Sequence, residues 1–542
     1  MNFKNKYYAF SIFIYFVLIL SFIEWYLHLY TRSILFFLLT SIAYTLITIK
    51  IFIYPEKKYY LHIFSDIFLL SIFLRFSIYY NFPTVYGYDP FTFVGHIKNI
   101  ISTGFLTPDL EKYIGFPFYH ILVVIFNGFS GFSIKDSYFI GSIIEVFCGL
   151  FVLIICKNLF NIKAGLLATS LILIAPYYFY WGFWIIPMTL SMNFYIFIVY
   201  FIVKQKEEFN KLIVPFLIIL LTSIFTHPIG SVIIMITFIV FYIYPNIGPI
   251  KDKVISIQIL LFTAVSTYIH WSLTTSGENI DLFSNLMIRL AITIRARTLG
   301  IYDITRITAA PLMKFTSIFL IDLPFVLLLF FGLLGSLYAI DKIVKNKKFI
   351  YIELLITTLL LVSITYLSGL ISITSVEPAR WFTFIEILLI IFASNGLIII
   401  FNRKSLKNYK IFACFTILFI FIFSSMTTPL SNTESAFYSD EFIRRAALTS
   451  SELSATVFFN NYYSNKIFVS YDYLLINMTS IYLDELYVTP DKPLVVRTYD
   501  VEHGLLVEDQ RFAFYPNLEF NNYINSSDKL FDNNKVQGYL RK

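Results

Sequence analysis

The chain is long, strongly apolar and poor in charge. Of its 542 residues, 58% are hydrophobic, 20% are aromatic and only 14% are charged. Soluble domains carry about 25% charged residues, so this composition excludes an ordinary water-soluble protein. The net charge of +7 comes from Lys and Arg in short gaps between apolar runs, a distribution that argues against a nucleic-acid partner.

Apolar runs recur along the chain up to residue 427. A helix needs about 20 such residues to cross a bilayer, so we predict a polytopic α-helical membrane protein with about 13 transmembrane helices. The predicted spans are 8–27, 33–53, 61–80, 139–157, 163–179, 184–203, 211–226, 228–244, 254–271, 315–340, 349–370, 380–401 and 409–427.

The charged gaps between these spans indicate the topology. With this set of spans, every basic cluster falls on one side of the membrane, and the positive-inside rule makes that side cytoplasmic. The clusters are Lys4 and Lys6, Lys57 and Lys58, Lys157 and Lys163, Lys204 to Lys211, Lys251 and Lys253, Lys342 to Lys348, and Arg403 to Lys410. We therefore expect a multi-pass cell-membrane protein with a cytoplasmic N-terminus.

The same topology divides the chain into two parts. A transmembrane domain, residues 1–427, has outward loops at 81–138 and 272–314, and residues 428–542 follow on the outer side. The tail is rich in Asp, Glu, Asn and Ser and contains strand-like runs such as "KIFVSYD" and "KPLVVRTYD". We predict that the tail is a small extracytoplasmic α/β domain.

The first outer loop begins with an amphipathic pattern. Asp89 before Pro90 is typical of a helix N-cap with proline at the first helical position, and Gly104 suits the far end. Steps of three and four residues from Asp89 place polar side chains on one helical face. These are Thr92, His96, Asn99 and Thr103. The pattern predicts an interfacial helix, in which Asp89 is either a functional acid or simply a cap.

The rest of this loop adds further ionisable groups. Asp109, Glu111 and His120 follow within "FLTPDLEKYIGFPFYH", before a short apolar helix. Residues 89–120 of this outward loop gather three carboxylates and two histidines against a membrane, which makes the loop a candidate active site.

These features resemble the GT-C superfamily of membrane glycosyltransferases, which use polyprenyl-phosphate-linked sugars. The resemblance rests on an Asp shortly before a His, a short helix ending in Gly, an acidic segment and "FP-x-x-H". It extends over most of residues 60–400 and includes "THPIG", "WIIPMTLSM" and "EPARWFTFIEILLIIFASNGL". It implies a GT-C-like fold for the transmembrane domain.

The resemblance also implies a chemistry. Asp89 matches the catalytic base of the family, which takes the proton of an acceptor hydroxyl as that hydroxyl attacks the anomeric carbon with inversion. The departing lipid phosphate needs a cation. Arg380 is the first candidate, although it could merely pair with Glu377. The other candidates are Arg297, Arg289, Arg295 and Arg306.

Other polar residues are assigned supporting roles. His96, Asp109, Glu111 and His120 would bind donor or acceptor, or hold a divalent cation, but no tight ligand spacing requires a metal. Glu278 would contact a sugar or acceptor hydroxyl, or be a solvated loop residue. No other cofactor is expected. For His227 before Pro228, a cap or packing role is favoured over chemistry.

Two other functions compete with a glycosyltransferase. A transporter or lipid-glycan flippase would place ionisable residues at mid-membrane, whereas here the acids concentrate in outer loops and the spans look nearly free of charge. Glu145 and Asp66 are exceptions, expected to be paired or functional, although Asp66 is near the cytoplasmic end of its span and could instead lie at the interface. A catalytically inactive assembly subunit is the third reading.

The expected partners are a polyprenyl-phosphate sugar, membrane lipid and an acceptor that is a glycan, a lipid or a protein. The "WWD" signature of oligosaccharyltransferases is absent, which argues against transfer of a whole glycan to asparagine. An adjacent pair of acids, common in protein mannosyltransferases, is also absent.

Overall fold

The protein is described by a computed structural model. The residues that it describes are 3–28, 30, 32–54, 56–106, 115–204, 206–247, 254–274, 281–285, 287–288, 291, 315–346, 349–370, 378–401, 409–428, 447–454, 494–497, 507–508, 511–512, 527–532 and 536–541.

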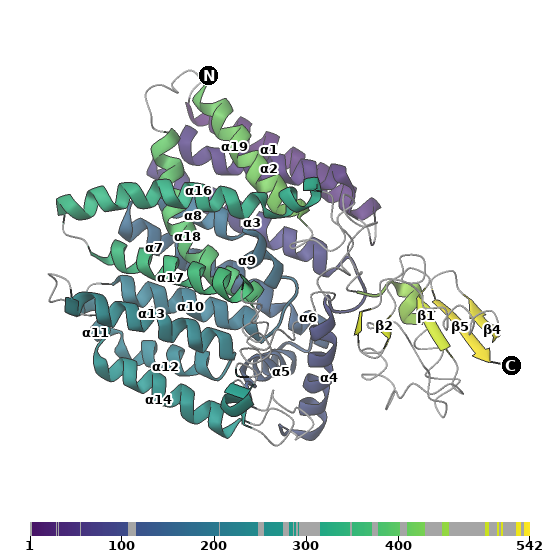
Figure 1. The fold of residues 1–542 in the computed structure, drawn as a ribbon. Helices are drawn as coiled ribbons and strands as arrows, with labels where there is room; N and C mark the ends of the chain where they lie inside the picture. The colour runs from purple at the N-terminus through teal and green to yellow at the C-terminus, as the bar shows by residue number, and fades with distance from the viewer. Residues whose placement is uncertain are drawn as a thin grey trace.

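Helices make up nearly all of the described chain before residue 429 (Figure 1). They are α1 (Phe3–Leu27), α2 (Ile34–Ile53), the 3-10 helix η1 (Lys57–Tyr59), α3 (Tyr60–Tyr79), α4 (Tyr88–Thr103), α5 (Phe118–Ser130), α6 (Ile134–Tyr138), α7 (Ile140–Leu159), α8 (Ile162–Ile172), α9 (Pro176–Trp181), α10 (Pro187–Val203), α11 (Lys206–Lys211), α12 (Ile213–Ile224), α13 (Pro228–Ile247), α14 (Ile257–Leu273), α16 (Phe315–Asn346), α17 (Ile350–Leu370), α18 (Pro378–Phe401) and α19 (Lys410–Thr427).

Eight helices of the described chain are long and apolar enough to cross a membrane. They cover Asn5–Leu27, Ile34–Ile53, Lys57–Tyr79, Ile134–Leu159, Pro228–Asn246, Asp322–Ile340, Ile350–Ser368 and Arg380–Phe401. Shorter apolar helices, such as α10, α12 and α14, lie at most of the remaining predicted spans. The protein is thus a polytopic helical membrane protein, and the count of about 13 crossings stays a prediction.

The predicted span 163–179 is wrong as a single helix. Helix α8 ends at Ile172, and α9 starts afresh at Pro176. Proline lacks an N–H and disfavours helical geometry in the residue before it, so it starts helices more readily than it continues them. The break leaves residues 176–186, "PYYFYWGFWII", as a short helix and turn inside the bundle. We call these residues the aromatic segment.

Helix α18 is the most enclosed of the candidate spans and lies between α16 and α17 (Figure 1). Glycines allow α16 and α18 to approach closely. A Cβ at Gly335 would lie 1.9 Å from the carbonyl oxygen of Phe392, and one at Gly396 would lie 2.2 Å from that of Phe331. Small residues at helix contacts stabilise membrane bundles because they let backbones pack directly. This contact fixes α18, whose first turn carries Arg380.

Strands occur near the C-terminus. Strand β5 (Val536–Arg541) pairs antiparallel with both β1 (Leu494–Arg497) and β4 (Ser527–Asp532), and β2 (Val507–Glu508) pairs with β3 (Arg511–Phe512). The run "KPLVVRTYD" therefore contains a strand, as predicted, whereas "KIFVSYD" lies outside the described residues. The boundary of a separate α/β domain remains a prediction.

Candidate active site

Asp89 lies in the first turn of α4 and is half-buried. The prediction that Asp89 is the N-cap was wrong by two residues, because the cap is Gly87, with φ 106°. A Cβ at Gly87 would lie 2.8 Å from the Trp184 ring, so this sharp entry into α4 requires glycine. The helix N-terminus places partial positive charge beside the Asp89 carboxylate.

The two faces of α4 agree with the amphipathic prediction. Phe93, Val94 and Ile97 are buried, whereas Thr92 is exposed and His96 is half-buried. Gly104 ends the helix in the left-handed conformation, as expected. The polar face that begins at Asp89 is therefore presented outward from the packed body of the protein.

His96 and His120 are brought together by packing of α4 on α5. Their ring centroids are 5.9 Å apart, and the Phe93 ring lies 5.1 Å from that of His120. Burial, helped by the nearby His96, lowers the pKa of His120 to about 3. His120 is therefore a neutral imidazole at physiological pH.

Several predicted site residues lie outside the described residues. They are Asp109, Glu111, Glu278, Glu377, Arg289, Arg295, Arg297 and Arg306. Within the described ranges, no three His, Cys, Asp or Glu side chains come together to hold a metal ion. Two imidazoles are fewer ligands than a zinc site needs, so the described donor set does not by itself fit a bound metal.

Arg380 lies in the first turn of α18 and is half-buried. Its guanidinium carbon is 5.8 Å from the centre of the Trp181 ring, and its Nη1 is 3.4 Å from His227 Nε2. His227 Nδ1 in turn lies 3.3 Å from the Ile229 N–H, so this histidine caps the start of α13, as expected. A neutral imidazole has only one acceptor nitrogen. His227 can therefore accept from Ile229 at Nδ1 or from Arg380 at Nε2, but not from both at once.

The aromatic segment connects the two predicted functional groups. Trp184 packs against Gly87, two residues before Asp89, while Trp181 lies beneath Arg380. Trp181 also donates from Nε1 to Thr383 Oγ1 at 2.9 Å, one turn along α18 from Arg380. The positions of Asp89 and Arg380 thus depend on one short stretch of chain. Neither tryptophan was predicted as a site residue. The dense run of aromatic residues in "YYFYWGFW" could have pointed to this segment.

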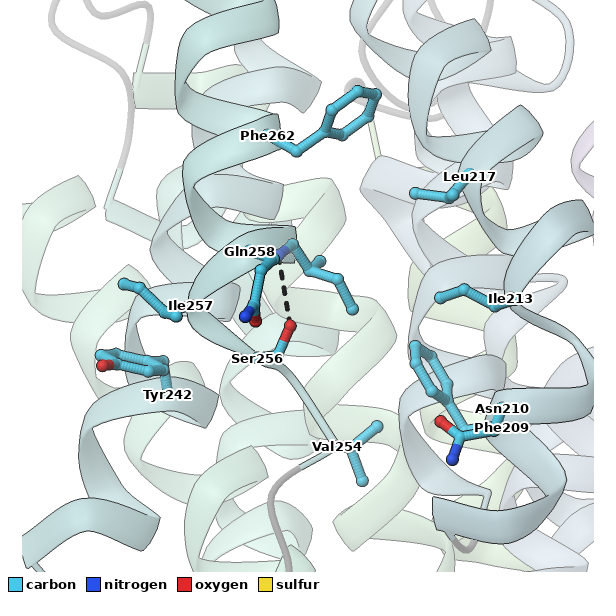
Figure 2. Close-up of a pocket in the computed structure, with 11 residues that line it drawn as sticks. Phe209, Asn210, Ile213, Leu217, Tyr242, Val254, Ser256, Ile257, Gln258 and Phe262 are labelled. Atoms are coloured by element: carbon cyan, nitrogen blue, oxygen red, sulfur yellow. Dashed lines mark hydrogen bonds between the residues drawn. The ribbon is translucent and has the colours of Figure 1, made fainter.

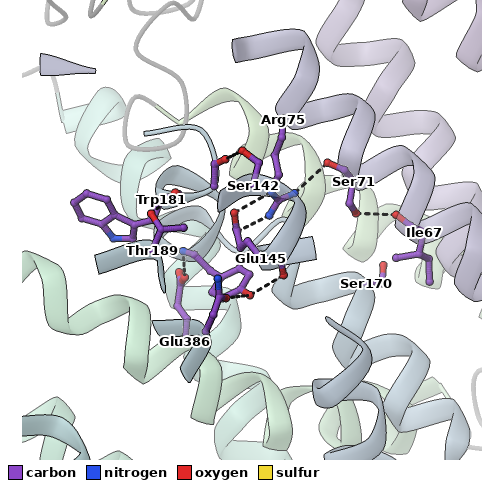
Figure 3. Close-up of polar contacts among 12 residues, drawn as sticks. Ile67, Ser71, Arg75, Ser142, Glu145, Ser170, Trp181, Thr189 and Glu386 are labelled. Atoms are coloured by element: carbon purple, nitrogen blue, oxygen red, sulfur yellow. Dashed lines mark hydrogen bonds and ion pairs between the residues drawn. The ribbon is translucent and has the colours of Figure 1, made fainter. Parts of the chain in front are cut away.

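A buried ion pair packs against this segment (Figure 3). Arg75 on α3 and Glu145 on α7 meet in a bidentate contact at 2.6 and 3.0 Å, and both side chains are fully buried. A Cβ at Gly182 would lie 1.8 Å from Glu145 Oε2. Ser142 donates from Oγ to the Gly182 carbonyl. The turn after α9 therefore packs directly against the ion pair and leaves no room for a side chain at Gly182.

Glu386 on α18 anchors the other end of α9. Its carboxylate accepts from the backbone N–H of Tyr178 at 2.9 Å and of Tyr177 at 3.3 Å (Figure 3). These are donors of the first helical turn, which otherwise lack partners inside the helix. The residue falls within the motif "EPARWFTFIEILL", but its role was not predicted.

The expectation of spans nearly free of charge was wrong. Besides Arg75 and Glu145, the helices bury Lys50 against Asp66 at 2.7 Å, and Tyr15 donates to the same Asp66. The expectation that Glu145 and Asp66 would be paired, if not functional, is confirmed. Charges at membrane depth are expensive unless they are satisfied, so these pairs connect helices rather than line an ion path.

A groove of about 650 Å³ lies between α11, α12, α13 and α14 (Figure 2). Its lining is mostly apolar, with Asn210, Ser256 and Gln258 as polar exceptions. Among the described residues that line it, none carries a carboxylate, an imidazole or a cationic group. The candidate active site is therefore sought at α4 and α18 instead.

The fold is similar to that of a solved membrane glycosyltransferase. The archaeal oligosaccharyltransferase of Archaeoglobus fulgidus is a structural neighbour. Its complex with Zn and sulfate matches with a TM-score of 0.52 and 14% identity, over 88% of this chain and 73% of that one. Its complex with an inhibitory peptide and a dolichol-phosphate, under the name AglB, matches with a TM-score of 0.50 and 12% identity, over 89% and 75%.

The likeness is one of fold. The match to the apo form has a TM-score of 0.48 and 14% identity, and it covers 81% of this chain but only 62% of that protein's length. No protein-family model and no curated protein matches the sequence significantly. At the level of fold, the likeness to this oligosaccharyltransferase agrees with the GT-C resemblance inferred from the motifs.

Proposed function

We propose that this chain is an integral-membrane glycosyltransferase. It would transfer a sugar from a polyprenyl-phosphate-linked donor to an acceptor hydroxyl at the outer face of the cell membrane. The observation that carries the proposal is that one aromatic segment packs against Gly87, two residues before Asp89, through Trp184 and against Arg380 through Trp181, in a fold like that of an oligosaccharyltransferase. A carboxylate and a guanidinium held by one element suit a reaction that removes a proton at one end and releases a phosphate at the other.

In this mechanism Asp89 is the general base. Its carboxylate takes the acceptor's hydroxyl proton while the acceptor oxygen bonds to the anomeric carbon. The bond from that carbon to the phosphate oxygen breaks, the electron pair leaves with polyprenyl phosphate, and the anomeric configuration inverts. Arg380 stabilises the charge that develops on the phosphate.

Supporting roles fall to the remaining loop residues. His96, on the Asp89 face of α4, would hydrogen-bond donor or acceptor hydroxyls next to the neutral His120. Asp109, Glu111 and Glu278 are proposed to complete the site, and Arg297 to assist Arg380. A divalent cation is proposed only as an addition to this set, and a neighbour of the same fold was crystallised with Zn.

The proposed donor class is supported by the dolichol-phosphate in the AglB complex. An acceptor peptide with an NVT sequon is tethered in another structure of that protein. For this chain the absence of "WWD" argues against the same acceptor, and a glycan, lipid or protein hydroxyl is proposed instead.

The test is sugar transfer by the full chain in nanodiscs, with labelled polyprenyl-phosphate sugars and total membrane extract as acceptor. Asp89→Asn should lower the rate by roughly 10²–10⁴-fold, the usual contribution of a general base. Asp136→Asn is the matched control, because Asp136 lies in the same outer loop, where it accepts from Tyr80 and Ser133.

Undiminished transfer by Asp89→Asn would reject Asp89 as the base. If the wild-type chain instead moves labelled lipid across the bilayer without transferring sugar, the flippase reading replaces the enzyme. Activity in neither assay would favour an assembly subunit.

A further inference from the structure

Helix α14 carries buried polar side chains for which the described part of the chain offers no hydrogen-bond partner. Thr267, His270 and Trp271 are only 4%, 7% and 6% exposed. Thr267 Oγ1, His270 Nε2 and Trp271 Nε1 find no partner in the part of the chain that the structure describes. Their spacing of three and four residues places them on one face of the helix. Buried polar atoms are normally satisfied, so a cluster of three calls for a ligand.

This face adjoins the loop that carries Asp89. The His270 ring lies 5.0 Å from that of Phe116 and 4.3 Å from that of Phe225. The other ring nitrogen of His270 hydrogen-bonds the carbonyl of Gly115. Because the backbone of Phe116 likewise hydrogen-bonds His120, two histidines from different helices hold adjacent residues of the first outer loop.

Gly115 fixes the contact sterically. A Cβ at this position would lie 2.3 Å from Thr274 Cγ2, so only glycine allows the loop to lie directly on the end of α14. The unsatisfied atoms therefore lie one and two turns back along α14 from a direct contact with the first outer loop.

The three groups define a neutral recognition chemistry. The indole N–H donates, the threonine hydroxyl donates or accepts, and His270 accepts at Nε2 because its other nitrogen carries the proton. The set is uncharged, so it suits neither a phosphate nor a metal cation. Sugar hydroxyls both donate and accept, and aromatic rings such as Phe116 and Phe225 provide apolar surface for the ring carbons.

We propose that Thr267, His270 and Trp271 form a subsite for hydroxyl groups of the transferred sugar. This inference rests on the proposed function and adds the residues that recognise the carbohydrate. Among the described residues the three buried polar atoms have no hydrogen-bond partner, and the bound sugar supplies their partners. Part of the affinity for the sugar thus comes from removing the desolvation cost that these unsatisfied polar atoms carry in the free protein.

The test combines stability and binding, so that it does not depend on turnover. The full chain in nanodiscs is titrated with polyprenyl-phosphate glucose, mannose and galactose, and with polyprenyl phosphate alone. Thr267→Val removes only the hydroxyl, and Trp271→Phe removes only the indole donor. Thr263→Val is the matched control, since Thr263 is buried on the same helix but donates to the Ile259 carbonyl at 2.8 Å.

Thr267→Val should raise the melting midpoint of the ligand-free protein by about 1–3 °C, because an unsatisfied group is removed. It should also raise the Kd of the best sugar donor about 5- to 10-fold and leave the Kd of polyprenyl phosphate unchanged. Trp271→Phe should weaken the sugar donor in the same selective way. Thr263→Val should change neither Kd.

Equal donor affinity in the wild type and both variants would overturn the subsite while leaving the proposed function intact. A parallel loss of affinity for polyprenyl phosphate alone would show that these residues maintain structure and would also overturn it. A wild-type chain that binds no polyprenyl-phosphate compound would overturn the proposed function together with the subsite.

Discussion

At the scale of single residues, the candidate site depends on positions where no larger side chain fits. Gly87 admits Trp184, and Gly182 admits the Glu145 carboxylate, so both sides of the aromatic segment are packed to contact. Tight packing of this kind transmits small changes in volume directly to the neighbours. The predictions at this scale concern one such glycine and one buried histidine.

Gly182→Ala should lower the free energy of unfolding by roughly 1–3 kcal/mol, because the added methyl would lie within 1.8 Å of Glu145 Oε2. Thermal melting in detergent measures the change. Gly128→Ala is the control, since a Cβ there meets nothing within 4 Å, and in this helical position it should stabilise by up to about 1 kcal/mol. Equal effects of the two substitutions would contradict the proposed packing.

His120 should make stability depend on pH. Its pKa is about 3 in the folded protein and near 6.5 when exposed, so below pH 6.5 the unfolded chain binds more protons. Stability from this residue is complete above pH 6.5 and is lost progressively as the pH falls towards 3. At pH 4.5 the loss amounts to about 3 kcal/mol. Melting at pH 7 and 4.5 should show a larger drop for the wild type than for His120→Gln, and an identical drop would refute this assignment.

At the scale of elements, buried polar contacts join helices that are distant in sequence. Arg75 and Glu145 join α3 to α7, and Glu386 joins α18 to the start of α9. Lipid tails are as apolar as the helix surfaces, so the hydrophobic effect does little to hold helices together within a membrane. Directional polar contacts therefore help to select one arrangement of the bundle. The aromatic segment, and with it the spacing of Asp89 and Arg380, depends on that arrangement.

Arg75→Met or Glu145→Met alone should destabilise the bundle by about 3–5 kcal/mol, because each leaves one buried charge without its partner. The double substitution should cost clearly less than the sum, since no charge then remains. Denaturant unfolding in mixed micelles measures the cycle. The pair of Lys204 and Glu208 is the control, because it is partly exposed and should show coupling below about 1 kcal/mol. Additive losses at Arg75 and Glu145 would contradict a coupled pair.

At the scale of the whole molecule, contacts between loops agree with the predicted topology. Gly115 meets Thr274, the Leu448 N–H bonds Thr84 Oγ1, and the hydroxyl of Tyr30 bonds Ser450. Apart from Tyr30, these residues lie in loops or in the tail that were predicted to face outward, an orientation that remains a prediction. One face of the bundle therefore brings together the start of the tail and the loop that carries Asp89.

The topology can be tested by thiol labelling, because the native Cys148, Cys156 and Cys414 are buried and should stay silent. Ser102→Cys, on the exposed end of α4, should react with a membrane-impermeant reagent added outside intact cells. Lys58 is exposed just before the N-terminal end of α3, on the side predicted to be cytoplasmic. Lys58→Cys should therefore react only after permeabilisation. Labelling of both positions from one side would refute the assigned orientation and the outer-face mechanism.

Part of this molecule follows from local sequence. Apolar runs predict the helices, and the steps from Asp89 to His96 predict the polar face of α4, because helical periodicity involves residues only three or four apart. Pro176 also indicated the break within 163–179, but the continuous apolar run around it led to the prediction of a single span.

Only the tertiary structure decided which distant residues meet. Glu145 was expected to find some partner, but its pairing with Arg75, 70 residues earlier, depends on how α3 packs against α7. Trp181 below Arg380 and His270 against Gly115 likewise depend on the packing of elements far apart in the chain. A sequence pattern reports what one helix presents on each face, whereas steric fit and charge pairing between helices determine which faces touch.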